Sequence, residues 1–210
     1  MTEADARDWL RANLDVPRET FARLDRFVAL LSAESARQNL IAASTLPAIW
    51  SRHIVDSAQL LPLAGGSPAT WLDLGSGAGF PGLVIATLSE AHVTLVDSRK
   101  KRVAFLAEAA AALGIASRVT LLCSRVETMP DGQHDAISAR AFAPLDRLLP
   151  IAARFARPDT IWLLPKGKSA ASELDAARGS WQGAFRIEPS VTDPEAAIIV
   201  ATQVKPRGNR

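Results

Sequence analysis

The sequence predicts an α/β fold with a mainly parallel seven-stranded sheet, helices on both faces and a helical extension at the N-terminus. Three observations support this prediction. Helical apolar spacing dominates residues 1–62, strand and helix signals alternate from residue 69 onward, and a glycine-rich loop follows the first of those strands at 75–82. Strands that alternate with helices are typically joined by crossovers, which makes neighbouring strands parallel.

The central part of the prediction consists of five strands and the helices between them. The strands are expected at 69–74, 92–97, 119–123, 135–139 and 160–164, and the helices near 80–90, 98–113, 144–156 and 169–178. The helix at 98–113 has an apolar stripe at helical spacing, and Gly114 is expected to cap its end. Two further strands, at 184–188 and 196–204, are expected to form a hairpin-like pair at the sheet edge.

Composition and charge exclude several classes of protein. A hydrophobic content of 48% and a charged content of 22% are ordinary for a globular chain, and no apolar run approaches the roughly 20 residues of a membrane span. The polar, acidic N-terminus and the single cysteine suggest neither secretion nor disulfides, so we expect a cytoplasmic protein with no membrane partner. Net charge is only +2, but residues 99–168 hold 12 Lys and Arg against 6 Asp and Glu, which favours a polyanionic partner.

The glycine-rich loop is typical of a site that holds a nucleotide-type cofactor. Gly75 and Gly77 fit the dinucleotide fingerprint, but Phe80 occupies the place of its third glycine. A phosphate-binding Walker loop is excluded because no Gly-Lys-Ser/Thr follows. Asp73 puts a carboxylate beside the loop, which suits a ligand with ammonium or sulfonium charge better than a phosphate. S-adenosylmethionine, whose demethylated product is S-adenosylhomocysteine, is such a ligand.

A second anchor lies at the end of the next strand. Asp97 follows Gly75 by 22 residues and is placed to accept both ribose hydroxyls, although dehydrogenases share this feature. After the third strand, the segment 124–127 is placed to line an adenine. The complete set of predicted cofactor-binding residues is Asp73, Gly75, Ser76, Gly77, Ala78, Gly79, Phe80, Asp97, Val126, Glu127 and Arg140.

The chain of 210 residues is expected to form one globular domain in two parts. Residues 1–62 are expected to be a helical segment packed on the core, in which Pro17 opens one helix and 46–61 forms one or two more. Residues 63–210 are expected to be a Rossmann-like domain that binds S-adenosylmethionine.

The sequence resembles the bacterial small-subunit ribosomal RNA guanine-N7 methyltransferases, the glucose-inhibited division protein B family. The resemblance runs from about 38 to 168, and its blocks taken in order are highly specific. They are Asn39-Leu40, Arg52–Ser57, Leu72–Gly82, Leu95–Ser98, Lys101–Leu106, Ser124–Glu127 and Ser138–Ala143. It implies a class I S-adenosylmethionine-dependent methyltransferase that acts on guanine N7 in the decoding region of 16S ribosomal RNA, either as RNA or as a 30S particle.

The resemblance and the residues together suggest roles in catalysis. Guanine N7 carries a free lone pair and no proton, so positioning and electrostatics should dominate and no general base is needed. We expect Arg140, at the carboxyl end of the fourth strand, to be the catalytic residue and Phe142 to stack on the base. Arg125, Lys166 and Lys168 are candidate RNA phosphate contacts. We expect a monomer without a bound metal.

The chain departs from the family pattern in two places. Pro165 stands before Lys166-Gly167, where the family reads Leu-Lys-Gly, and the segment 194–198 lacks an arginine that the family often has. The roles of Asn39, His53 and Asp56 stay open, with a hydrogen-bonded helix junction or packing against the glycine loop favoured for the last two.

Other functions fit the sequence less well. A nicotinamide oxidoreductase would use a tyrosine in hydride transfer, and this chain contains no tyrosine. An exocyclic-amine methyltransferase would have an Asp/Asn-Pro-Pro-aromatic signature after the fourth strand, and this chain does not have it. Cys123 could be the nucleophile of a C5-pyrimidine methyltransferase, but a small buried hydrophobe is favoured. A non-catalytic S-adenosylmethionine-binding module also remains. The main alternative is a methyltransferase that acts on a small molecule or a protein.

Overall fold

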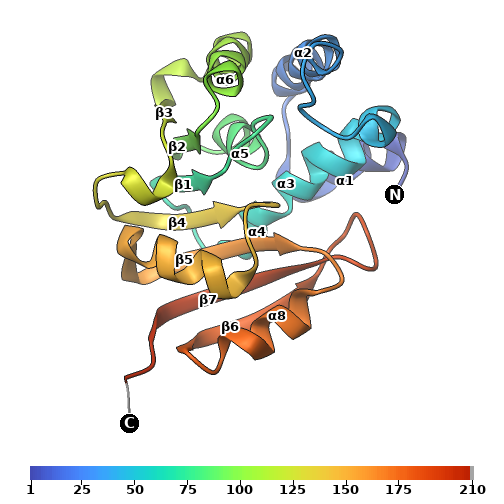
Figure 1. The fold of residues 1–210 in the computed structure, drawn as a ribbon. Helices are drawn as coiled ribbons and strands as arrows, with labels where there is room; N and C mark the ends of the chain where they lie inside the picture. Colours follow the sequence, from blue (N-terminus) through green and yellow to red (C-terminus); the bar gives the residue numbers. More distant parts are fainter. Residues whose placement is uncertain (209–210) are drawn as a thin grey trace.

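Seven strands form one sheet in the computed structural model, which describes residues 1–208 (Figure 1). Their order across the sheet is β3-β2-β1-β4-β5-β7-β6. The order reverses between β1 and β4, and ligands of such open α/β sheets bind outside the carboxyl ends of the strands at that point. The strands are β1 (Thr70–Leu74), β2 (His92–Asp97), β3 (Val119–Cys123), β4 (His134–Ala139), β5 (Ala156–Lys166), β6 (Trp181–Pro189) and β7 (Ala197–Pro206).

The directions of the strands confirm the prediction of a mainly parallel sheet with an edge hairpin. The pairs β1–β2, β1–β4, β2–β3 and β4–β5 are parallel, and β7 is antiparallel to both β5 and β6. The strand β5 extends beyond the predicted 160–164 at both ends. Its carboxyl end pairs with β7 through Lys166, so Pro165 lies within a continuous ladder opposite Ile198.

Helices cover both faces of the sheet, and each face has its own apolar core. One core joins α5 (Gly82–Leu88), α6 (Lys100–Leu113) and the N-terminal helices to the sheet, and the other lies under α7 (Leu145–Ala152) and α8 (Ala170–Ala177). In β1, Trp71 belongs to the first core and Leu72 to the second, as expected for side chains that alternate across a strand. Gly114 caps α6 in a left-handed conformation, as predicted.

The N-terminal segment is helical, as predicted, but its last part differs from the expectation of one or two ordinary helices at 46–61. It begins with α1 (Glu3–Leu14) and α2 (Arg18–Ser35), whose N-cap residues are Thr2 and Pro17. It continues with the 3₁₀-helix η1 (Ala43–Ala48), the π-helix η2 (Trp50–Val55) and two short turns, α3 (Asp56–Ala58) and α4 (Leu60–Leu63).

A proline and a contact from α1 account for this irregular stretch. Pro47 lies within η1 and has no N–H to donate. The Glu3 carboxylate of α1 then accepts the backbone N–H groups of Trp50 (3.0 Å) and Ser51 (2.9 Å) at the start of η2. Tertiary contacts therefore replace part of the regular helical ladder, and the outcome is a π-helix, a form often found at functional sites.

Among residues 1–208, no helix is both long and apolar enough to cross a membrane.

Candidate active site

The Asp73 carboxylate at the carboxyl end of β1 connects the glycine loop to the neighbouring strand. One of its oxygens accepts a hydrogen bond from Ser138 Oγ of β4 (2.7 Å), and the other accepts one from the backbone N–H of Gly82 at the start of α5 (3.3 Å). Trp71 Nε1 donates to the same Ser138 oxygen (2.9 Å). Burial raises the pKa of Asp73, while these hydrogen bonds act in the opposite direction. The carboxylate lies beneath the loop and braces it.

The glycine loop runs from the end of β1 to α5, and its glycines serve two purposes. Gly75, Gly77 and Gly79 all have positive φ, at 71°, 56° and 94°, which explains why a glycine stands at every second position. A Cβ on Gly75 would lie 2.5 Å from Phe142 Cδ2, so this glycine lets the aromatic ring cross the loop closely. At Gly79 a Cβ would instead collide with Leu83 inside the core.

The other predicted loop residues are turned inward. Ser76, Ala78 and Phe80 are buried, and the Ser76 hydroxyl donates to Asp73 O (3.0 Å) and accepts from Val96 N (3.2 Å). The side chains of these three residues therefore pack beneath the loop and support it, whereas Gly75 and Gly77 are partly exposed.

A cavity of about 620 Å³ opens between this loop and the ends of β2 and β3. Four residues predicted to bind the cofactor contribute to its wall: Gly75, Asp97, Val126 and Glu127. We call it the cofactor cavity. Arg125 and Phe142, predicted as RNA contacts, also line it, together with Val96, Ser98, Arg99, Arg102, Ser124 and Ala141.

Asp97 is the principal acceptor in the cofactor cavity. Its Oδ2 accepts from Gly77 N (3.1 Å) and pairs with Arg102 (3.3 Å), while its Oδ1 accepts from Arg99 N (2.8 Å). These contacts hold the carboxylate at the carboxyl end of β2, where a bound ribose would present its two hydroxyls. The geometry is compatible with the predicted role of Asp97.

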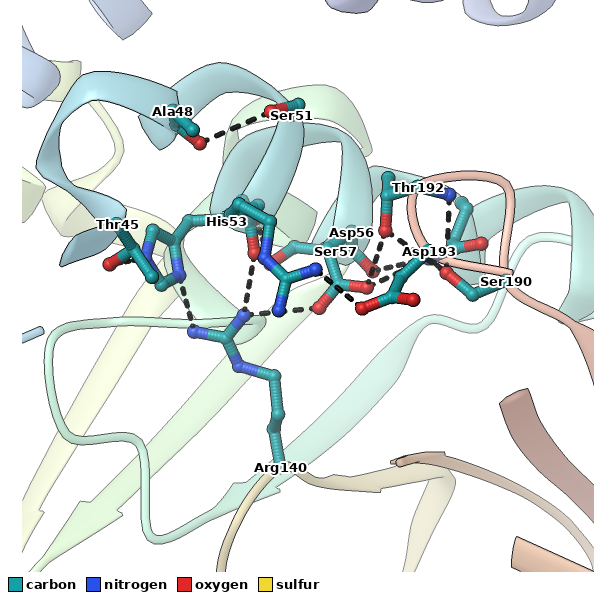
Figure 2. Close-up of polar contacts among 12 residues, drawn as sticks. Thr45, Ala48, Ser51, His53, Asp56, Ser57, Arg140, Ser190, Thr192 and Asp193 are labelled. Atoms are coloured by element: carbon teal, nitrogen blue, oxygen red, sulfur yellow. Dashed lines mark hydrogen bonds and ion pairs between the residues drawn. The ribbon is translucent and has the colours of Figure 1, made fainter. Parts of the chain in front are cut away.

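Arg140 follows β4 and reaches into the N-terminal segment, as Figure 2 shows. Its guanidinium donates to Asp56 Oδ2 (3.1 Å), to His53 Nδ1 (3.1 Å) and to the carbonyl oxygen of Arg52 (3.3 Å). It also lies 5.1 Å from the centre of the Phe80 ring, a cation–π distance. The π-helix η2, through Arg52 and His53, and the turn α3, through Asp56, thus fix the position of the predicted catalytic residue Arg140.

His53 is a neutral hydrogen-bond acceptor for this arginine. Burial, together with the positive charges of Arg140 and Arg52, lowers the pKa of His53 to about 3. Since Nδ1 accepts from Arg140, the ring proton lies on Nε2, which donates to Thr45 Oγ1 (2.8 Å). The ring also stacks on Phe80 at 5.0 Å, so His53 both packs against the glycine loop and forms the helix junction that the sequence favoured.

A second cavity, of about 640 Å³, lies beside the cofactor cavity, and we call it the acceptor cavity. Its wall contains Arg140 and shares Ala141 and Phe142 with the cofactor cavity. Ala141 has a φ of 52°, a left-handed conformation that non-glycine residues rarely adopt and that is common at functional sites. The end of β4 therefore forms the partition between the two cavities.

Three ion pairs balance the charge of the acceptor cavity. Arg140 pairs with Asp56, Arg52 pairs with Asp193 at 2.6 Å, and Lys166 pairs with Glu173 at 2.8 Å; all six residues line the cavity. Sequence reasoning missed Asp193 and Glu173, because nothing local marks them. Arg52 was noted only as part of a matching block, and its contact with Asp193 spans 141 residues.

The remaining predicted RNA contacts differ in their surroundings. Lys166 is largely buried, and its Nζ donates to Ala143 O (2.8 Å) as well as pairing with Glu173, so it anchors the loop after β4. Lys168 and Arg125 are exposed, and Arg125 forms a loose pair with Glu127 at 3.6 Å. Lys166 therefore takes part in internal contacts, whereas the side chains of Lys168 and Arg125 are exposed.

One expectation was wrong. Cys123 is exposed, because it ends β3, the edge strand of the sheet, where no neighbouring strand covers it. Within residues 1–208, no group of three or more His, Cys, Asp and Glu side chains is placed to hold a metal ion.

Solved structures define the class to which this fold belongs. An O-methyltransferase from Bacillus cereus, in complex with SAH, matches with a TM-score of 0.63 at 11% identity, over 96% of this chain and 97% of that one. A ribosomal protein L11 methylase from Lactobacillus delbrueckii subsp. bulgaricus matches with a TM-score of 0.59 at 19% identity, over 70% and 76% of the two chains. The fold is that of a class I S-adenosylmethionine-dependent methyltransferase, as the sequence predicted.

Sequence relatives identify the family. The model of the GidB family, described as rRNA small subunit methyltransferase G, matches residues 20–194, so the chain belongs to that family. A relative from Rhizorhabdus wittichii named Ribosomal RNA small subunit methyltransferase G is 61% identical over 99% of this chain and 96% of that protein. One of the same name from Zymomonas mobilis is 54% identical over the same shares. The chain is therefore a methyltransferase, and the resemblance seen in its sequence is confirmed.

The lowered pKa of His53 predicts a specific acid sensitivity. Between about pH 6.5 and 3 the unfolded chain binds a proton at His53 that the folded chain refuses, so stability is lost as pH falls through this range. The loss is about 1.4 kcal/mol per pH unit, or about 2 kcal/mol at pH 5. His53→Gln, which keeps an acceptor and a donor, should lack this dependence in urea unfolding at pH 7 and pH 5. His92→Gln, on an exposed side chain of β2, should keep it, and an unchanged pH slope in His53→Gln would contradict the account.

Proposed function

We propose that this methyltransferase transfers a methyl group from S-adenosylmethionine to N7 of a guanine in the decoding region of small-subunit ribosomal RNA. The observation that carries the proposal is the pair of cavities that meet at Ala141 and Phe142, with Arg140 in the wall of one and Asp97 in the wall of the other. The names of the close relatives support the choice of ribosomal RNA as substrate.

The residues of the cofactor cavity fit S-adenosylmethionine. Asp97 would accept the ribose hydroxyls, Val126 and Glu127 would border the adenine, and Gly75 would let the methionine end pass close to the backbone. Asp73 would act from beneath by holding the loop in place. When bound, the cofactor supplies an electrophilic methyl group on a sulfonium centre.

The acceptor cavity suits an uncharged base that needs no deprotonation. In each of the three ion pairs around it, the positive and negative charges cancel. Among the described contacts, Arg140 uses three of the five N–H donors that an arginine has. The two that remain would donate to guanine O6, which leaves the adjacent N7 lone pair free to attack. Phe142 would stack on the base at the border with the cofactor cavity.

The proposed function also includes the location of the enzyme, its oligomeric state and the form of its RNA substrate. We propose that the enzyme acts in the cytoplasm as a monomer, without a metal ion, on either the RNA or the 30S particle. Among the residues named from the sequence, the proposed phosphate contacts are Arg125, which lines the cofactor cavity, and the exposed Lys168, which follows Gly167 of the acceptor cavity.

A methyl-transfer assay tests the function directly. Labelled S-adenosylmethionine would be supplied with 30S particles, or with naked small-subunit RNA, from cells that lack the modification. Borohydride reduction and aniline cleavage should reveal one N7-methylguanine, in the decoding region, and the better acceptor would show which form is recognised. Cofactor binding without any RNA methylation would refute the proposal and favour a small-molecule or protein substrate.

Replacing Arg140 with lysine should separate charge from geometry. Lysine keeps the positive charge but cannot contact His53, Asp56 and the base at once, so we expect turnover to fall roughly 100-fold with an intact fold. Single-turnover methylation of the preferred acceptor would measure this change. The control is Arg147→Lys on the exposed face of α7, which should keep wild-type turnover. Equal rates in the two variants would show that Arg140 is not the catalytic residue.

A further inference from the structure

Four consecutive basic residues, Arg99, Lys100, Lys101 and Arg102, occupy the start of α6. They line a cavity of about 360 Å³ together with Gln38 and Asn39, which come from the connection between α2 and η1. We call this cavity the basic cleft. It is built from two segments that lie far apart in the sequence, and none of its lining residues is acidic.

Most of the positive charge in the basic cleft is unpaired. Arg102 pairs with Asp97 at 3.3 Å, but in the described part of the chain no ion pair involves Arg99, Lys100 or Lys101, and all three are exposed. The first turn of α6 contains no acidic residue. Cations in the first turn of a helix oppose its dipole and repel one another, so this arrangement costs stability and needs another explanation.

The position of the basic cleft relates it to the methyl-transfer site. Arg99 and Arg102 line both the basic cleft and the cofactor cavity, while Phe142 lines both the cofactor cavity and the acceptor cavity. The three cavities therefore form a row with the cofactor cavity in the middle. A polymeric ligand with one of its residues in the acceptor cavity and others in the basic cleft would therefore cross the mouth of the cofactor cavity.

We propose that the basic cleft binds backbone phosphates of the RNA strand that carries the acceptor base, which rests on the proposed function. Lysine and arginine side chains neutralise phosphates without reading sequence, and Asn39 adds an exposed amide donor for a phosphate or a ribose hydroxyl. The contact fixes the register of the strand and draws it across the bound cofactor. Lys100 and Lys101 serve only this contact, since they lie outside the walls of both other cavities.

The test compares two neutralised double variants with the same change in charge. One is Lys100→Gln with Lys101→Gln, and the control is Arg178→Gln with Lys205→Gln, on exposed positions at the end of α8 and on β7. Affinity for naked small-subunit RNA would be measured from low to physiological salt. The first variant should bind about tenfold more weakly at low salt, and the slope of log affinity against log salt should shrink by about 1.4, or about 0.7 per lost contact with single-stranded phosphate. The control should match the wild type, and both variants should bind S-adenosylhomocysteine normally.

The outcomes separate this proposal from the proposed function. If the wild type methylates the guanine and the Lys100 and Lys101 variant keeps its RNA affinity and salt slope, the phosphate site is refuted and the function stands. If the wild type binds RNA through these lysines but methylates none, the function fails and the phosphate site stands. Equal losses in both double variants, or no RNA binding by the wild type, would overturn the phosphate site. The last result would direct attention to an acidic protein partner.

Discussion

The buried carboxylate of Asp73 is the constraint on which the rest of the site depends. It lies at the end of β1, where the strand order reverses, and it joins three elements: β1 itself, the start of α5 through Gly82 and β4 through Ser138. The glycine loop is one wall of the cofactor cavity, and the end of β4 divides that cavity from the acceptor cavity. A single buried side chain thus fixes the relative position of both walls, and its desolvation is offset by the hydrogen bonds that it accepts.

The N-terminal segment positions Arg140 and contributes to the wall of the acceptor cavity. Its π-helix places His53 on the Phe80 ring and receives the Arg140 guanidinium, while Asp56 accepts a hydrogen bond from Thr192 of the segment before β7 (3.2 Å). The acceptor cavity is therefore assembled from four separate stretches of chain around the carboxyl edge of the sheet. Because the helical segment shares one apolar core with α5 and α6, it acts as part of the catalytic domain.

Local patterns were enough to predict the sheet, the glycine loop and the position of Asp97 at the end of β2, because each depends on residues close together in sequence. The full length of β5 was missed because its carboxyl end is defined by pairing with β7, and its amino end by the pairing of Ala156 with His134 of β4. The helix type at 50–55 was missed because Glu3 takes part in it from α1. The contact of Asp73 with Ser138 of β4 was also missed, because it joins two strands that lie 65 residues apart in the sequence. Cys123 was misjudged because an apolar strand pattern does not tell an edge strand from a central one.

The central claim is that the two cavities have separate tasks, with the cofactor beside Asp97 and the acceptor base beside Arg140. Equilibrium binding of S-adenosylhomocysteine, measured by calorimetry on Asp97→Asn and Arg140→Ala, tests this most directly. The account predicts that Asp97→Asn weakens binding by about tenfold or more, since a charged acceptor is lost. Arg140 was also predicted to bind the cofactor, but it lines only the acceptor cavity, so Arg140→Ala should change binding by less than about twofold. A loss confined to Arg140→Ala would contradict the division, because the cofactor would then occupy the cavity assigned to the base.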